Sequence, residues 1–401
     1  MTNHSFFKRP ENLLLIMAFV MPMTFSVWNA LLNNFVIEKA AFTGKEIGLL
    51  QSIREIPGFL AFTAVFVLLF IKEQRFALLS LLTMSVGVAV TGYFPTAIGL
   101  YLTTLLMSIG FHYFETINQS LTLQWLDKDK TAEFMGKSLA VKSFASLLAY
   151  GLIWLLMEWM DISYQHMYLL SGIAGVLIVL FIWAAFPLFP QHHQQHKKMV
   201  LRKQYWLYYG LTFLSGARRQ IFMVFAGYMM VEKFGYSVGQ IAMLFAVNYL
   251  FNLFFAVRIG KWIGHVGERK VLMLEYIGLI IVFVSYAFVS DGKVAAALYI
   301  IDHLFFALAI AIKTYFQKIA DPKDIAATAG VSFSINHIAA VVIPALLGLV
   351  WLTSPKLVFL TGAGFAICSF ILALNIPVNP TRENQANVGN ITIKPSPETN
   401  T

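Results

Sequence analysis

Charged residues are scarce in this sequence, and cysteine is almost absent. Only 12% of the 401 residues are charged, against roughly 25% in an ordinary soluble domain, whereas 58% are apolar. The single cysteine, Cys368, excludes a disulfide framework and a cysteine-rich metal site. No P-loop, HExxH or GxSxG motif is present, so the motifs indicate neither an enzyme nor an ATP-driven pump. A chain of this composition cannot build a polar surface, and we expect it in a membrane.

Twelve apolar stretches are long enough to cross a membrane. A hydrocarbon core of roughly 30 Å needs about 20 helical residues, and a backbone in lipid must satisfy its hydrogen bonds within each segment. We place these stretches at 12–36, 47–71, 76–94, 97–124, 136–160, 166–187, 204–231, 238–258, 271–289, 294–317, 327–352 and 355–378. The predicted fold class is therefore all-α, a polytopic membrane protein with twelve transmembrane helices.

The one long polar connector divides these spans into two groups of six. We expect an N-terminal six-helix bundle over 1–190, a cytoplasmic linker over 191–203, a C-terminal six-helix bundle over 204–378 and a disordered cytoplasmic tail over 379–401. Most loop Lys and Arg residues fall on the side of the N-terminus, which predicts that both termini are cytoplasmic, in a bacterial inner membrane. This placement also explains the net charge of +9 without a nucleic-acid partner.

The linker carries three histidines, in the sequence QHHQQHKKMVLRK. Such a tract can bind metal, but a solvated cytoplasmic linker explains the same composition. We therefore predict no metal site, no cofactor and no catalytic residue.

The two halves are weakly repeated. A shift of 194 residues aligns FVIEKAAFTGKEIGLL, which begins at Phe35, with MMVEKFGYSVGQIAML, which begins at Met229. In this alignment Thr43 meets Ser237, between the first two spans of each half. Two parallel repeats are typical of transporters whose halves rock about a central site.

By its span count, its six-plus-six division, its central basic loop and its parallel repeat, the chain resembles the major facilitator superfamily. The loop GKWIGHVGERK is similar to that family's cytoplasmic signature Gly-x-x-x-Asp-Arg-x-Gly-x-Arg-Arg/Lys, although Gly264 and His265 replace its usual Asp and Arg. The resemblance implies a loop that latches one conformation. Gating is therefore predicted for the matching residues Gly260, Gly267, Arg269 and Lys270. No motif identifies a subfamily.

Polar residues concentrate in the first, fourth, seventh and tenth spans, which line the cavity in that superfamily. An ionisable group at the bilayer centre costs roughly 2.5 to 3.5 kcal/mol, so such residues usually face the bundle interior. The predicted substrate-binding residues are Arg218, Arg219, Asn29, Asn33, His112, Asn118, Gln119 and Gln220.

Arg218 and Arg219 lie in the middle of the seventh span. Consecutive helical residues point about 100° apart, so one arginine is expected to face the cavity and the other to pair with an acid on a neighbouring helix. An ion-pair role for both is the alternative. A small excess of deep cations favours an anionic or zwitterionic solute.

Carboxylates within the spans are candidates for proton coupling. Glu115 shares a helix face with His112, and a nearby arginine can link the protonation of such a carboxylate to substrate binding. Asp302, with His303 beside it, is the alternative carrier. A permanent salt bridge is the competing interpretation of Glu115.

A second gating element is predicted in the second span. Arg54 and Glu55 lie about two turns from its outer end, and the helix-bending Pro57 follows them. They are interpreted as an outer gate or, equally well, as an entrance charge.

The sequence thus predicts a monomeric secondary active transporter for a small anionic or zwitterionic organic solute, working by alternating access in the lipid bilayer and coupled to protons. Symport and antiport both stay open. The alternatives are a multidrug or metabolite exporter of the same fold, or a channel or membrane receptor. A fold of inverted repeats would show interrupted helices in both halves, which the sequence does not predict.

Overall fold

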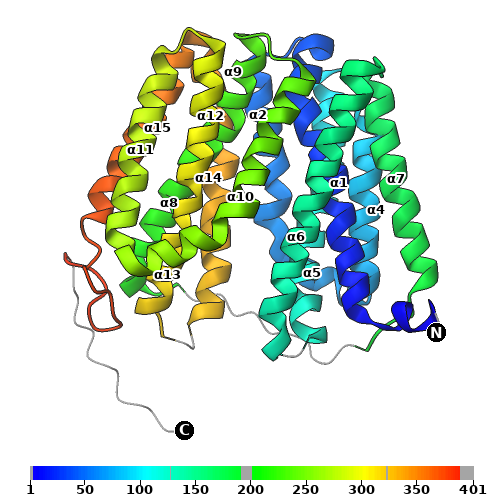
Figure 1. Cartoon of the computed structure of the whole chain (residues 1–401), viewed down its shortest axis with the longest axis horizontal. Helices are drawn as coiled ribbons and strands as arrows, with labels where there is room; N and C mark the ends of the chain where they lie inside the picture. The colour runs from blue at the N-terminus through cyan, green and yellow to red at the C-terminus, as the bar shows by residue number, and fades with distance from the viewer. Residues whose placement is uncertain (1–2, 127, 191–200, 322–323, 389–401) are drawn as a thin grey trace.

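The computed structural model describes residues 3–126, 128–190, 201–321 and 324–388, and almost all of this chain is helical (Figure 1). The N-terminal half contains η1 (Asn3–Lys8), α1 (Pro10–Ala40), α2 (Gly44–Phe59), η2 (Leu60–Thr63), α3 (Ala64–Val67), α4 (Glu73–Thr91), α5 (Ala97–Trp125), α6 (Lys128–Ile153), η3 (Trp154–Trp159) and α7 (Tyr164–Ala185). The C-terminal half contains η4 (Lys203–Tyr205), α8 (Trp206–Ile221), η5 (Phe222–Ala226), α9 (Gly227–Glu232), α10 (Val238–Val266), α11 (Glu268–Phe288), α12 (Gly292–Phe306), η6 (Ala307–Ala309), α13 (Ile310–Ile319), α14 (Ile325–Thr353) and α15 (Pro355–Ala373).

Ten helices among the described residues are long and apolar enough to cross a membrane. The two other predicted spans correspond to the segment from α2 to α3 and the segment from α8 to α9, each of which changes helix type along its length and carries charged residues. The prediction of an all-α chain with twelve crossings in two sets of six is confirmed.

The outward surfaces of the bundle are apolar, as a lipid environment requires. On α7, Leu170, Leu177, Leu180 and Phe181 are all exposed. An exposed apolar stripe of this kind would be unfavourable in water, so it agrees with an integral membrane protein.

Several spans are less regular than the sequence predicts. The second span changes to a 3-10 turn at Leu60–Thr63, three residues after Pro57, which cannot donate a backbone hydrogen bond. The tenth span contains a 3-10 turn, η6, and the fifth and seventh spans contain π-helical segments, η3 and η5. Each of these spans stays helical across the change of helix type, so the broken helices of an inverted-repeat fold are not seen in them. Segments of π-helix occur often at functional sites.

The repeat is visible in the backbone between the first two spans of each half. Ala41 and Gly235, which the 194-residue shift superimposes, both have a positive φ, of 50° and 64°. Two residues later, Thr43 and Ser237 each begin the next helix with a capping box. The same turn and the same cap therefore recur in both halves.

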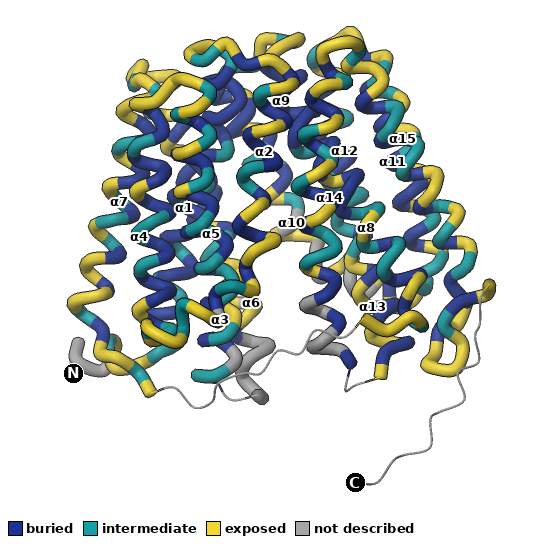
Figure 2. Tube along the Cα trace, turned by 180° about the vertical axis from the view of Figure 1, so that it is seen from behind, coloured by how far each residue is buried: buried dark blue, intermediate teal, exposed yellow. Residues whose placement is uncertain are grey.

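The halves meet at the end of the molecule that lies opposite both termini, which we call the outer end (Figures 1 and 2). There the side-chain amide of Asn34 donates to the Tyr236 carbonyl at 2.7 Å, and Glu158 accepts from the Ser237 hydroxyl at 2.5 Å. From this end the Cα traces of the two halves diverge toward the termini (Figure 2).

A close helix crossing joins the halves below the outer end. A Cβ on Gly48 of α2 would lie 2.3 Å from the Pro344 carbonyl oxygen of α14 and 3.0 Å from the Gly348 Cα. Because such distances are too short for any side chain, glycine at position 48 permits the two helices to pack backbone against backbone.

The segment after α15 corrects one prediction. Residues 379–388, expected to be disordered, lie against the C-terminal half. The Tyr315 hydroxyl donates to the Gln385 carbonyl at 2.5 Å, and the Asn387 amide donates to the Asn375 carbonyl at 2.7 Å. The acceptors of these hydrogen bonds are backbone carbonyls, which every residue has, so residue composition does not predict these contacts. The rest of the predicted tail and the linker histidines lie outside the described residues.

Candidate functional site

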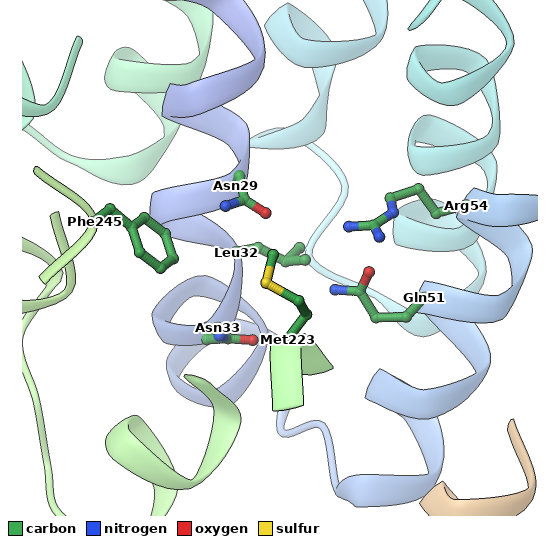
Figure 3. Close-up of a pocket in the computed structure, with 7 residues that line it drawn as sticks. All are labelled: Asn29, Leu32, Asn33, Gln51, Arg54, Met223 and Phe245. Carbon is green, nitrogen blue, oxygen red and sulfur yellow. The ribbon is translucent and has the colours of Figure 1, made fainter. Parts of the chain in front are cut away.

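A small cavity lies between the two halves at the centre of the bundle (Figure 3). It is lined by Asn29, Leu32 and Asn33 of α1, Gln51 and Arg54 of α2, Met223 of η5 and Phe245 of α10. Its free volume of about 10 Å³ is close to the minimum that holds one water molecule. In this conformation the two halves are therefore drawn closely together around a polar centre.

Arg219 is the accessible cation of this region. Its side chain is exposed, and it is not one of the residues that line the small cavity itself. It lies close enough to Arg54 and Glu55 for their charges to interact. Two guanidinium groups and one carboxylate give this group a net positive charge.

Arg218 has a different environment from its sequence neighbour. It is 1% exposed, and its guanidinium lies 3.6 Å from the carboxylate of Glu275, which is 0% exposed. The guanidinium also lies 4.5 Å from the centre of the Tyr276 ring, a distance at which cation–π attraction acts. Arg218 thus forms an ion pair with α11, whereas Arg219 is open to the interior space.

Asp302 adds a second carboxyl group to this buried ion pair. It is 0% exposed, and neither of its carboxyl oxygens accepts a hydrogen bond from the described residues. Arg218 and Glu275 are both within electrostatic range. The group therefore contains two buried carboxyls and one cation. His303, beside Asp302, directs its Nδ1 at the Tyr299 carbonyl at 3.0 Å.

Glu115 and His112 contact different partners, although both belong to α5. Glu115 lies 2.9 Å from the Lys142 ammonium group, and both side chains are partly exposed. The His112 ring packs against the His337 ring, with ring centres 5.3 Å apart. The shared helix face predicted from the sequence therefore does not bring these two side chains into one group.

The other predicted substrate ligands are distributed unevenly. Asn29 and Asn33 line the cavity. Asn118 and Gln220 are buried away from the cavity lining, and Gln119 is exposed.

Arg54 and Glu55 lie at the level of the cavity. The Arg54 guanidinium donates to Glu55 Oε1 from Nε at 3.0 Å and from Nη2 at 2.5 Å, and Arg54 is part of the cavity wall. These two residues therefore adjoin the candidate substrate site.

The predicted cytoplasmic latch is a tight turn between α10 and α11. Gly267 adopts a φ of 89° there, which glycine tolerates without strain. Glu268 is 2% exposed and lies 2.8 Å from the Lys318 ammonium group of α13. An acid of the loop thus makes the buried contact. The predicted members Arg269 and Lys270 are not part of this ion pair, and Gly260 belongs to α10.

Sequence reasoning missed three residues of the cavity wall, Gln51, Met223 and Phe245. Gln51 precedes Arg54 by three positions, so the two share one helix face, and that spacing could have indicated it. Nothing in the sequence distinguishes Met223 and Phe245 from the many apolar residues of the chain.

Comparison with known proteins agrees with this geometry. The family model described as Major Facilitator Superfamily matches residues 208–396. A mutant of the nucleoside transporter NupG has a similar structure, with a TM-score of 0.76, 16% identity and coverage of 91% of this chain and 99% of that chain. A bacterial homologue of the human lysosomal transporter Spinster, in an inward-facing and occupied conformation, has a TM-score of 0.66, 14% identity and coverage of 90% and 95%. No curated protein matches the sequence significantly.

The family match and the transporter structures together indicate a membrane transporter and not an enzyme. The family match over residues 208–396 and the two similar structures support a transporter of the major facilitator superfamily.

Proposed function

We propose that this transporter moves a small organic solute with a negatively charged group, and that Arg219 binds that group. The accessibility of Arg219 at the centre of the molecule is the observation that carries the proposal. Arg54 lies nearby, and Glu55 balances only one of the two positive charges. A guanidinium group binds a carboxylate or phosphate through two parallel hydrogen bonds, so this group would select a planar or tetrahedral anion.

The position of the site supports alternating access. The cavity wall combines residues of α1 and α2 with residues of η5 and α10, so a rocking motion of the two halves would expose it to each side in turn. The halves touch at the outer end and diverge toward the termini. With cytoplasmic termini, as the loop charges predict, this is an inward-facing arrangement.

A thermal-stability screen of the purified protein tests anion recognition, because a ligand stabilises the state that it binds. The panel contains organic anions, zwitterions, nucleosides, sugars and amines. We expect an anionic or zwitterionic compound to raise the unfolding midpoint of the parent. The Arg219→Lys variant should bind this compound only at higher concentration, and the Arg219→Gln variant should not bind it. Equal binding curves for all three proteins would contradict the proposal.

A neutral nucleoside is the second candidate substrate. The amides of Asn29, Asn33 and Gln51 surround the cavity together with the Phe245 ring, which suits hydrogen bonding to hydroxyl groups and stacking on a base. NupG, which has a similar fold, is a nucleoside transporter. Nucleosides that stabilise the parent and Arg219→Gln equally would favour this candidate over the anion.

We further propose that Asp302 carries a proton during transport. Two buried carboxyls share the single cation Arg218, and an unbalanced buried charge is costly, which favours one bound proton in the group. Glu115, predicted from the sequence as the first choice, is partly exposed and paired with Lys142.

Uptake into proteoliposomes with and without a pH gradient tests this assignment. Asp302→Asn should abolish gradient-driven accumulation and retain exchange at equilibrium, whereas Glu115→Gln should retain both. If Glu115→Gln loses gradient-driven accumulation and Asp302→Asn keeps it, Glu115 and not Asp302 is the proton carrier. Undiminished accumulation in both variants would exclude both carriers.

A further inference from the structure

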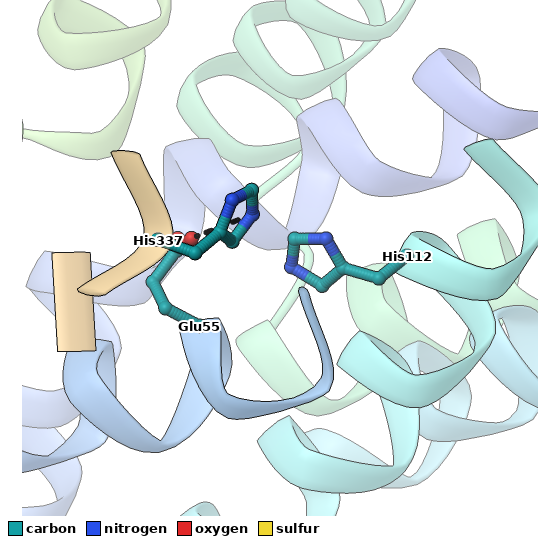
Figure 4. A group of neighbouring side chains, drawn as sticks. All are labelled: Glu55, His112 and His337. Atoms are coloured by element: carbon teal, nitrogen blue, oxygen red, sulfur yellow. Dashed lines mark ion pairs between the residues drawn. The ribbon is translucent and has the colours of Figure 1, made fainter. Parts of the chain in front are cut away.

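Three buried side chains from both halves converge next to the central cavity (Figure 4). Glu55 of α2 and His112 of α5 belong to the N-terminal half, and His337 of α14 belongs to the C-terminal half. One ligand atom of each, a carboxylate oxygen or an imidazole nitrogen, lies within 4.8 Å of the other two. The three side chains therefore bridge the two halves.

The hydrogen bond of His337 determines which of its nitrogens faces the group. Its Nδ1 lies 2.9 Å from the Phe333 carbonyl oxygen. A carbonyl oxygen can only accept, so Nδ1 carries the proton and, in the neutral ring, Nε2 has a free lone pair. That Nε2 lies 3.7 Å from Glu55 Oε2. Two acceptors face each other there, an arrangement that a cation between them would stabilise.

The space between the two rings depends on a missing side chain. A Cβ on Gly58 of α2 would lie 2.3 Å from Cδ2 of His337 and 2.7 Å from Cε1 of His112. Glycine at this position lets both imidazoles approach Glu55 from α5 and α14.

We propose that Glu55, His112 and His337 form a binding site for a transition-metal dication such as Zn²⁺, which joins the two halves of the transporter. Two imidazoles and one carboxylate are a ligand set that zinc takes up with a fourth position left for water. Tetrahedral ligands at about 2.1 Å from zinc lie roughly 3.4 Å from one another. Small side-chain rotations would close the present separations to that value.

The surroundings of Glu55 are compatible with this site. Arg54 donates only to Oε1, so Oε2 is left for the metal. A ligating carboxylate is commonly held by a second hydrogen-bonded group, as a ligating histidine is held by a carbonyl. The Phe333 carbonyl has that role for His337.

A metal at this point would oppose the transport cycle. Its ligands come from α2, α5 and α14, and rocking of the halves must change the contact between α2 and α14. Bound zinc would therefore stabilise the described arrangement and inhibit transport. A proton on Nε2 of His337 would also stabilise the approach of this nitrogen to Glu55 Oε2. The experiment must therefore distinguish a bound proton from bound zinc.

The test uses the full chain with His192, His193 and His196 of the linker replaced by Gln, because that tract can itself bind zinc. The thermal unfolding midpoint is measured at neutral pH against Zn²⁺, with Mg²⁺ as the control ion that prefers oxygen ligands. We expect a saturable rise with zinc alone. His112→Gln and His337→Gln should each weaken the apparent zinc affinity at least about tenfold, and His166→Gln, at an exposed histidine near the outer end, should leave it unchanged.

X-ray absorption of the zinc-loaded parent gives an independent readout that needs no substitution in the site. Two imidazole ligands are expected. The proposal is overturned if zinc and magnesium act alike, if either site variant keeps the parent affinity, or if the spectrum shows fewer than two imidazoles.

Discussion

Replacement of Arg218 by Met should destabilise the protein strongly. Arg218 and Glu275 are 1% and 0% exposed and lie 3.6 Å apart, with the buried Asp302 within electrostatic range. Removal of one partner of a buried ion pair costs about 3 to 5 kcal/mol, because the other charge stays buried without compensation. Native proteins are stable by only about 5 to 15 kcal/mol, so this loss is a large share of the total.

The same reasoning predicts a rescue. When both partners become apolar, as in Arg218→Met with Glu275→Met, no uncompensated charge is left by this pair, and the exchange is often neutral or stabilising. The double variant should therefore be more stable than Arg218→Met alone. The coupling is measured as a double-mutant cycle from unfolding midpoints in detergent.

Arg219→Met is the matched control, since it removes the same side chain one position further along α8. Arg219 is solvent-accessible, and a substitution at such a site usually changes stability by no more than about 0.5 kcal/mol. We expect near-parent stability and loss of anion binding. Equal destabilisation by the two Met variants would refute the assignment of Arg218 to structure and Arg219 to the substrate.

Further predictions concern closure of the outer end and topology. Gly48→Leu would clash with the backbone of α14, so a cysteine at Gln51 should react faster with a membrane-impermeant reagent added outside; an unchanged rate would contradict the close crossing. Glu158→Gln weakens charge-assisted hydrogen bonds to the start of α10, so it should also increase the labelling rate of the cysteine at Gln51. Glu158→Asp keeps the negative charge and should increase that rate less. Cysteines within 191–203 should react only from the cytoplasm and one near Lys39 only from outside; reaction of both from one side would contradict twelve crossings.

The fold was largely predictable because its strongest determinants are local. Apolar length alone identifies ten of the twelve crossings, and the aligned Thr43 and Ser237 do begin equivalent helices. The π-helical segment η5 was not predictable, because its sequence, FMVFA, has no residue that requires it. Order in residues 379–388 was missed for a related reason, since backbone carbonyls make the contacts.

The candidate site was predictable only in part. The sequence indicates that two consecutive arginines must face different surroundings, but it does not tell which of them pairs with Glu275. It also cannot bring Glu55, His112 and His337 together, because they lie on three helices from two halves. Long-range packing of α2 against α14 decides that contact.

Counterflow in proteoliposomes tests alternating access most directly. Vesicles loaded with an unlabelled ligand from the stability screen are diluted into a trace of the labelled ligand. A transporter that exposes one central site to each side in turn must accumulate label transiently above its equilibrium level, and Arg219→Gln should lose this accumulation. Label that only approaches equilibrium in the parent would indicate a channel and contradict the proposed mechanism.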